Sequence, residues 1–235
     1  MKTGSTTPTT EGQEEQLKRV VEDAVRRARK KVVLDKDAMQ RLLANGGRFR
    51  DDVIASLTKY SASDDRFGLL TSFELTVPKG YNHGTQLADF AEYAKKEEER
   101  FRYYNGSITD ANYAKATNKL IPGKTYGVKI FEIKKGEVVS SNDCLNLLFS
   151  QRAILVGAQG ASLVRQLKKE EFPVGKWTAS FDEKDALSTV DDGNHGVPFV
   201  LRYSDGGWEF DLGRFEVAWY GGKCLLCFCD LDLSA

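Results

Sequence analysis

The chain has 235 residues, of which 41% are hydrophobic and 29% charged, and its 34 basic side chains balance its 34 acidic ones. This length suits one large domain or two small ones, and the composition is typical of a globular protein. The zero net charge excludes a global field that would draw the protein to nucleic acid or to an anionic membrane.

The N-terminal segment predicts a disordered tail followed by a helical head. Residues 1–13 are rich in Thr, Gly and Pro and cannot bury apolar surface. Three patterns of apolar residues at intervals of three and four then follow, which is typical of short amphipathic helices. We expect a small bundle over residues 14–60 and a linker at 61–66, followed by an α+β domain over 67–235.

The middle of the chain mixes strand and helix signals. FGLLTSFELTV, beginning at Phe67, predicts a strand, and Thr85 precedes a helical pattern that continues to Tyr104. A second short helix is predicted over 110–119. TYGVKIFEI, residues 125–133, alternates as a strand does, and SSND at 140–143 is a strong N-cap cluster for the next helix.

The remaining residues predict a strand, a helix and then a meander. AILVG at 153–157 is typical of a buried strand, and ASLVRQLKKEEF predicts a helix. Four strand-like runs follow, separated by glycine turns at 205–207 and 221–222 that supply the positive φ of tight hairpins. We therefore predict an α+β fold with a small N-terminal helical bundle, an α/β-type segment and a C-terminal antiparallel β-meander.

The stretch RAILVGAQGASLVRQLKK, residues 152–169, has the outline of a phosphate-binding strand, turn and helix. Gly157 and Gly160 permit close approach to an anion, and Ser162 adds a hydroxyl. The stretch lacks the G-x-G pair of dinucleotide sites and the lysine of a P-loop. Two interpretations stay open, a nucleotide or phosphate site and close strand–helix packing, and the missing motifs favour packing.

KWTASFD, residues 176–182, predicts a further strand, and the residues from its end onward are acidic. They include Asp182, Glu183, Asp185, Asp191, Asp192 and His195. Strand ends can converge on one edge of a sheet, so Asp182, Asp191 and His195 are candidate partners of a ligand at the Gly157 turn. The irregular spacing is also that of a solvated acidic loop, which we prefer.

Four cysteines, Cys144, Cys224, Cys227 and Cys229, are too few and too clustered for a disulfide scaffold. Together they are the candidate metal ligands, but the C-x-x-C-x-C run lies in a predicted strand with no turn between its thiols. We expect buried reduced thiols, no metal and no cofactor. The sequence has no signal-peptide pattern and no apolar run long enough to span a membrane, which favours a cytoplasmic protein.

A basic run in the helical head raises the possibility of nucleic-acid binding. Its candidate residues are Arg26, Arg27, Arg29, Lys30 and Lys31. Acidic neighbours dilute this charge, so docking of a protein partner is the preferred interpretation.

Several stretches resemble bacterial hypothetical proteins that have no assigned activity. They are PGKTYGVKIFEI, VVSSNDCL, VGAQGASLV, GKWTASFDEKDAL, VPFV, WEFDLGRFE, CLLCF and, in the head, LDKDAMQRLLANGGRF. The resemblance implies a folded bacterial domain with a helical head on an α/β body, and it brings no catalytic residue with it.

The sequence contains only two histidines and no coherent catalytic constellation. We therefore expect a non-catalytic cytoplasmic interaction protein with a protein partner, and whether it is an enzyme stays open. The alternatives are an enzyme or sensor that binds a nucleotide or phosphorylated ligand at Gly157–Ser162, and nucleic-acid binding through the basic helices.

Overall fold

The computed structural model describes Lys18, residues 64–190 and residues 192–231. The chain divides into two units, Met1–Ala55 and Ser56–Ala235, and every described residue except Lys18 belongs to the second. The predicted tail and helical head lie outside the described residues, apart from Lys18.

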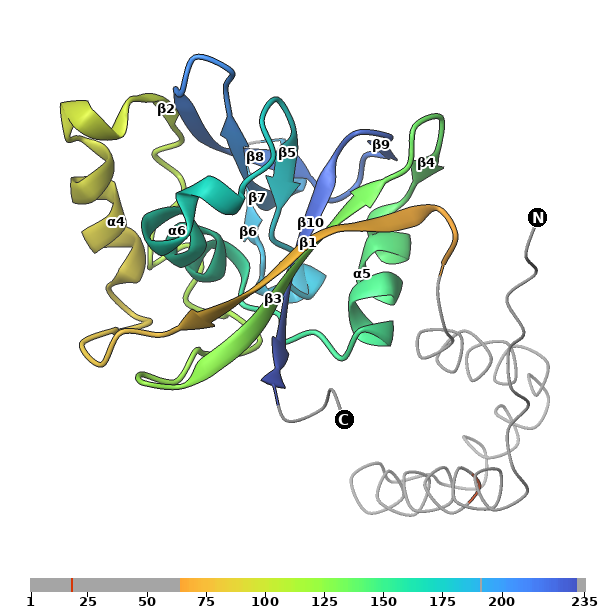
Figure 1. Cartoon of the computed structure of the whole chain (residues 1–235), viewed down its shortest axis with the longest axis horizontal. Helices are drawn as coiled ribbons and strands as arrows, with labels where there is room; N and C mark the ends of the chain where they lie inside the picture. The colour runs from red at the N-terminus through yellow and green to blue at the C-terminus, as the bar shows by residue number, and fades with distance from the viewer. Residues whose placement is uncertain (1–17, 19–63, 191, 232–235) are drawn as a thin grey trace. The chain divides into compact units, whose positions relative to one another are not determined.

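An eight-stranded mixed sheet organises the second unit (Figure 1). Its main path runs β1-β3-β10-β5-β7-β8-β2, and β6 pairs with β7. The strands are β1 (Phe67–Thr76), β2 (Phe101–Tyr104), β3 (Thr125–Ile133), β5 (Trp177–Ala179), β6 (Ser188–Thr189), β7 (His195–Arg202), β8 (Trp208–Arg214) and β10 (Cys224–Asp230). A second sheet pairs β4 (Val138–Val139) with β9 (Trp219–Tyr220).

The sheet contains two parallel pairings, and both join strands that are not consecutive in the chain. β10 pairs antiparallel with β3 on one side and parallel with β5 on the other, so the last described strand lies inside the sheet. β2 pairs parallel with β8 and ends the strand order. Both arrangements join segments that are far apart in the sequence.

The predicted fold class is therefore wrong. The described part is mostly β, and its three α-helices, α4 (Gln86–Ala94), α5 (Ser141–Ser150) and α6 (Gly157–Leu167), lie between strands of the chain rather than in an N-terminal bundle. The C-terminal strands belong to a mixed sheet and not to a simple meander. Periodicity indicates which segments are extended, but it does not indicate which strand each one pairs with.

Three predicted elements also differ locally. The helix expected to continue to Tyr104 ends at the 3₁₀ turn η1 (Glu97–Glu99), because Arg100 adopts a φ of 55° and β2 follows. Residues 110–115 form turns, and residues 116–119 form no helix. AILVG contributes a single bridge, Ile154 to Phe228, before α6 begins. The remaining 3₁₀ turns are η2 (Lys169–Glu171) and η3 (Lys184–Ala186).

Helix α6 is buried along most of its length. Residues 157–165 are all buried, and the helix lies between α4 and the strands (Figure 1). A Cβ added at Gly160 would stand 2.3 Å from Val156 Cγ2 and 3.0 Å from the Phe228 ring, so only glycine lets α6 approach β10 this closely. The two ends of this helix position the charged groups described below.

Helix α5 begins at the predicted N-cap cluster. The Ser140 side chain accepts a hydrogen bond from the Asp143 N–H, and the Asp143 carboxylate accepts one from the Ser140 N–H. This reciprocal capping box confirms the prediction from SSND. Among the described residues, no helix combines the length and apolar character needed to cross a bilayer.

Candidate functional site

The predicted phosphate turn forms the first turn of α6. Gly157 has a φ of 47°, and a Cβ added there would lie 3.2 Å from Asp182 Oδ2. Asp182 is buried, and its carboxylate accepts hydrogen bonds from the backbone N–H groups of Thr117 and Glu183 at 3.1 and 2.8 Å. A carboxylate of the chain itself therefore lies beside this helix N-terminus, where the helix dipole favours negative charge.

Ser162 faces the interior between α4 and α6. Its hydroxyl donates to the Gln159 carbonyl at 2.9 Å and accepts from the Gln86 side-chain amide of α4 at 3.1 Å. Gly160 lies against Val156 and Phe228. The hydroxyl and the glycine both have packing partners within the core.

The acidic segment does not gather at the Gly157 turn. Asp191 lies outside the described residues, Asp192 pairs with Arg214 at 2.7 Å, and His195 Nδ1 lies 2.7 Å from Glu216 Oε1. Of the three candidate ligand partners, the structure places Asp182 beside Gly157 and His195 in a separate hydrogen bond with Glu216. Burial raises the pKa of Asp182 to about 6, against the lowering effect of its hydrogen bonds.

The four cysteines are free, Cys144 in α5 and the other three in β10. Burial raises the pKa of Cys224 and Cys227 to about 12, so both thiols stay protonated at neutral pH. Within the described ranges no group of three or more His, Cys, Asp or Glu side chains is placed to hold a metal ion. The nucleic-acid candidates Arg26, Arg27, Arg29, Lys30 and Lys31 lie outside those ranges.

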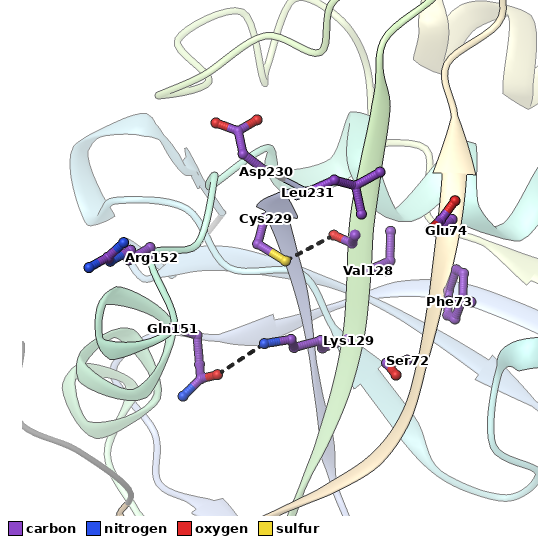
Figure 2. Close-up of a pocket in the computed structure, with 11 residues that line it drawn as sticks. Ser72, Phe73, Glu74, Val128, Lys129, Gln151, Arg152, Cys229, Asp230 and Leu231 are labelled. Atoms are coloured by element: carbon purple, nitrogen blue, oxygen red, sulfur yellow. Dashed lines mark hydrogen bonds between the residues drawn. The ribbon is translucent and has the colours of Figure 1, made fainter. Parts of the chain in front are cut away.

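A groove of about 360 Å³ crosses β1, β3 and β10 beside the end of α5 (Figure 2). Gly127 lines it, and a Cβ there would lie 3.0 Å from Cys229 Sγ. The Cys229 thiol contacts the Gly127 carbonyl at 3.4 Å, and Lys129 Nζ donates to Gln151 Oε1 at 3.4 Å, as the dashed lines in Figure 2 show. The central polar groups of this groove thus have partners within the chain.

A second hollow, of about 500 Å³, lies between the residues after β2 and the end of β8. Its amides are also engaged. Asn105 Nδ2 donates to Asp211 at 2.7 Å, and Asn112 Nδ2 donates to the Ser107 carbonyl at 2.8 Å. Arg214 at its wall is paired with Asp192. These pairings leave few free groups to recognise a ligand.

A third hollow, which we call the basic pocket, has a volume of about 270 Å³ and lies where the end of α6 meets the turn between β7 and β8. Its ionisable lining residues are the basic Arg100, Arg165, Lys169 and Arg202 and the acidic Glu98, Glu99 and Glu170. Four positive and three negative groups give a formal charge of +1.

Arg165 is the buried centre of the basic pocket. Its side chain has no exposed surface, and its Nη2 donates to the Glu99 carbonyl at 3.2 Å and to Glu99 Oε2 at 3.1 Å. Its Nε and Nη1 have no hydrogen-bond partner in the described part of the chain. The hydrogen-bonding capacity of this guanidinium is therefore only partly used, and each unpaired buried donor costs about 1–3 kcal/mol.

An indole ring joins two arginines of the pocket. The Arg165 Cζ lies 4.0 Å from the centre of the Trp208 ring, and the Arg202 Cζ lies 5.7 Å from it. Phe101 adds a second ring 5.0 Å from the Arg165 Cζ. Cation–π attraction offsets part of the cost of burying Arg165, but it supplies no oxygen to the free N–H groups.

Glu99 remains ionised beside Arg165. Burial opposes its charge, but hydrogen bonds from Tyr93 and Arg165 outweigh this effect and lower the pKa of Glu99. Lys169 Nζ stands 3.8 Å from Glu99 Oε2 and adds to the attraction. The pair holds the guanidinium at the base of the pocket.

Arg100 enters the pocket from a strained backbone. It is one of two non-glycine residues in the described ranges with positive φ; the other is Arg152, at 53°, which lines the groove of Figure 2. Such strain persists where the surroundings impose it, often at functional sites. A Cβ added at Gly206 would lie 2.9 Å from Arg100 Nη1, so this glycine lets the guanidinium lie against the turn.

Sequence reasoning missed the basic pocket. Its residues come from η1 and the residue after it, from α6, from η2, from the end of β7 and from the turn and strand that follow, and each one alone resembles a surface charge or a core aromatic. The available signal was Arg165 itself, a charged residue in a helix that is otherwise small and apolar over residues 157–164 except for Gln159 and Ser162.

Neither a family model, nor a curated protein, nor a solved structure matches the chain.

Proposed function

We propose that this protein is a non-catalytic binding protein that holds an anionic group of its ligand in the basic pocket. The observation that carries the proposal is Arg165, which is fully buried yet leaves Nε and Nη1 without partners at the pocket wall. A ligand oxygen at either nitrogen would make a charge-assisted hydrogen bond, which is about twice as strong as a neutral one.

The neighbouring cations suit this role in two ways. Arg202 is held in place, because its Nη1 donates to the carbonyls of Glu170 and Phe172 at 3.1 and 3.4 Å. Arg100 and Lys169 are exposed at the rim. An anion would meet the exposed charges first and the buried guanidinium last, an order that favours capture from solution.

The lining favours binding over chemistry. The pocket contains no Ser, Thr, Cys, His or Asp side chain, so no hydroxyl, thiol or imidazole nucleophile lies in its wall. Its innermost carboxylate, Glu99, is already paired with Arg165. A general base with a raised pKa is what proton transfer requires, and the pKa of Glu99 moves the other way.

The test is an NMR titration of the full ¹⁵N-labelled chain with sodium acetate and then with inorganic phosphate. We expect at least one anion to shift the Arg165 Nε–H and Trp208 indole N–H resonances in a saturable manner, and Arg202→Met to weaken binding about tenfold or more. Lys129→Met, which removes a cation from the groove of Figure 2, is the matched control and should bind as the wild type does. Unmoved Arg165 and Trp208 resonances with both anions would refute the proposal.

A further inference from the structure

We infer that the anionic group is the C-terminal carboxylate of an extended protein segment, which continues away from the basic pocket as an added strand along β2. This inference rests on the proposed function of the pocket and names the kind of partner it takes.

The charges in the pocket favour a carboxylate over a phosphate. The formal charge of +1 is neutralised by a single negative charge, whereas a phosphate monoester carries about −1.5 to −2 at neutral pH. Glu99 Oε2, only 3.1 Å from Arg165 Nη2, would repel the second charge of a dianion. Glu99 already engages Nη2, the nitrogen that forms a fork with either neighbour, so Nε or Nη1 would give a ligand carboxylate a single hydrogen bond.

The size of the pocket points to a small group. Its volume of about 270 Å³ lies below the ~300–1,000 Å³ of sites that enclose whole drug-sized ligands. One terminal residue fits this space, and the rest of the ligand must lie outside.

The sheet edge beside the pocket offers a place for the rest of the ligand. Arg100 lines the pocket and is the residue immediately before β2. Among the described strands, β2 pairs only with β8 and ends the sheet, as Figure 1 shows at its upper left. An edge strand presents N–H and C=O groups that an extended peptide can pair with, a common mode of peptide recognition.

The direction of β2 agrees with a C-terminus in the pocket. A segment that pairs antiparallel to β2 ends where β2 begins, which is at Arg100. The hydrogen bond from the Trp208 N–H to the Arg100 carbonyl, 3.0 Å long, fixes this end of β2 beside the indole of the pocket. Tyr103 is 49% exposed on the same strand and offers a side-chain contact farther along.

The experiment compares three peptides on the full chain by the same NMR resonances: N-acetyl-trialanine, its C-terminal amide, and N-acetyl-trialanine methylated at the central amide nitrogen. We expect the amide to bind at least about tenfold more weakly than the acid, because it lacks the charge. The methylated acid should bind several-fold more weakly than the parent, because it loses a strand hydrogen bond. Acetate and phosphate should both bind more weakly than N-acetyl-trialanine.

The outcomes separate this inference from the function on which it rests. The inference of a peptide C-terminus fails if the acid and the amide bind equally, or if phosphate binds more tightly than the peptide acid. It also fails if acetate or the methylated peptide binds as tightly as N-acetyl-trialanine. In each of these cases the pocket still binds an anion. If neither acetate, phosphate nor the peptide acid moves the Arg165 and Trp208 resonances, both the inference and the proposed function fail.

Discussion

The two ends of α6 carry opposite buried charges, and the fold completes them to different degrees. Asp182 lies at the N-terminal end and Arg165 in the last turn, so each sign suits the helix dipole. Asp182 receives hydrogen bonds from two backbone N–H groups. Arg165 uses one nitrogen for Glu99 and leaves two without partners beside an open hollow.

The Asp182 carboxylate thus has hydrogen-bond partners within the chain, whereas two nitrogens of Arg165 have none among the described residues. At Gly157, where the sequence favours packing over a phosphate site, the chain supplies its own carboxylate, whereas the C-terminal end of the helix leaves two Arg165 nitrogens without partners among the described residues. Glycine spacing alone therefore identified the end of α6 with less capacity to recognise a ligand. The following predictions test each end.

Removing the charge of Arg165, in the last turn of α6, should have the largest effect on stability. Arg165→Met leaves Glu99, whose side chain is 11% exposed, without its partner, so we expect a loss of about 3–5 kcal/mol in the free energy of unfolding. Urea denaturation measures it. Arg165→Met with Glu99→Gln should recover most of this loss, because no uncompensated charge remains. A single variant as stable as the wild type would show that the ion pair contributes little.

Protonation of Asp182 should change stability in the opposite sense to that of an ordinary carboxylate. Its pKa is about 6 in the folded chain and about 4 when unfolded, so between these values only the native state holds the proton. Its contribution is therefore present at low pH and is lost as pH rises from about 4 to 6, by about 3 kcal/mol in total.

This change must be measured against a variant. Burial lowers the pKa of His83 to about 4, and that residue acts in the opposite direction over a similar range. The difference in unfolding free energy between the wild type and Asp182→Asn isolates the carboxylate. A difference that stays constant between pH 4 and pH 7 would contradict an elevated pKa at this end of α6.

The glycine between the two ends should tolerate no side chain. Gly160→Ala places a methyl group against Val156 and Phe228, and we expect a loss of about 1–3 kcal/mol from overpacking. Gly106→Ala is the matched control, because a Cβ there meets nothing within 4 Å. Equal thermal stabilities of the two variants would refute the packing role of Gly160.

Replacing Arg100 or Arg152, the two arginines with positive φ, should change stability least. Comparing the two variants separates an effect on stability from an effect on binding. Glycine at either position relieves the positive φ and should stabilise the fold by about 0.5–1 kcal/mol. Arg152→Gly should bind acetate as the wild type does, whereas Arg100→Gly should bind it several-fold more weakly. A loss of binding in both variants would show that the charge of the whole surface, and not of the pocket, attracts the anion.

Local structure could be predicted from the sequence far better than pairing. The strand at 125–133 and the cap at Ser140 follow from alternation and from a side chain that bonds nearby N–H groups. The neighbours of β10 could not be predicted, because β3 and β5 are distant in sequence and no residue of CLLCFCD specifies either partner. The basic pocket depends on a different non-local contact: the β7–β8 hairpin pairs Arg202 with Trp208, and packing of α6 on β7 adds Arg165.

The position of β10 has a consequence for how the chain folds. Among the described strands, β3 and β5 are joined in one sheet only through β10, which follows β3 by about ninety residues. Until that long loop closes, each part of the sheet exposes an unpaired, apolar edge, and such non-local pairing is slow. Refolding of this protein should therefore pass through an interval in which it is prone to aggregate, and yields should fall as the chain concentration rises.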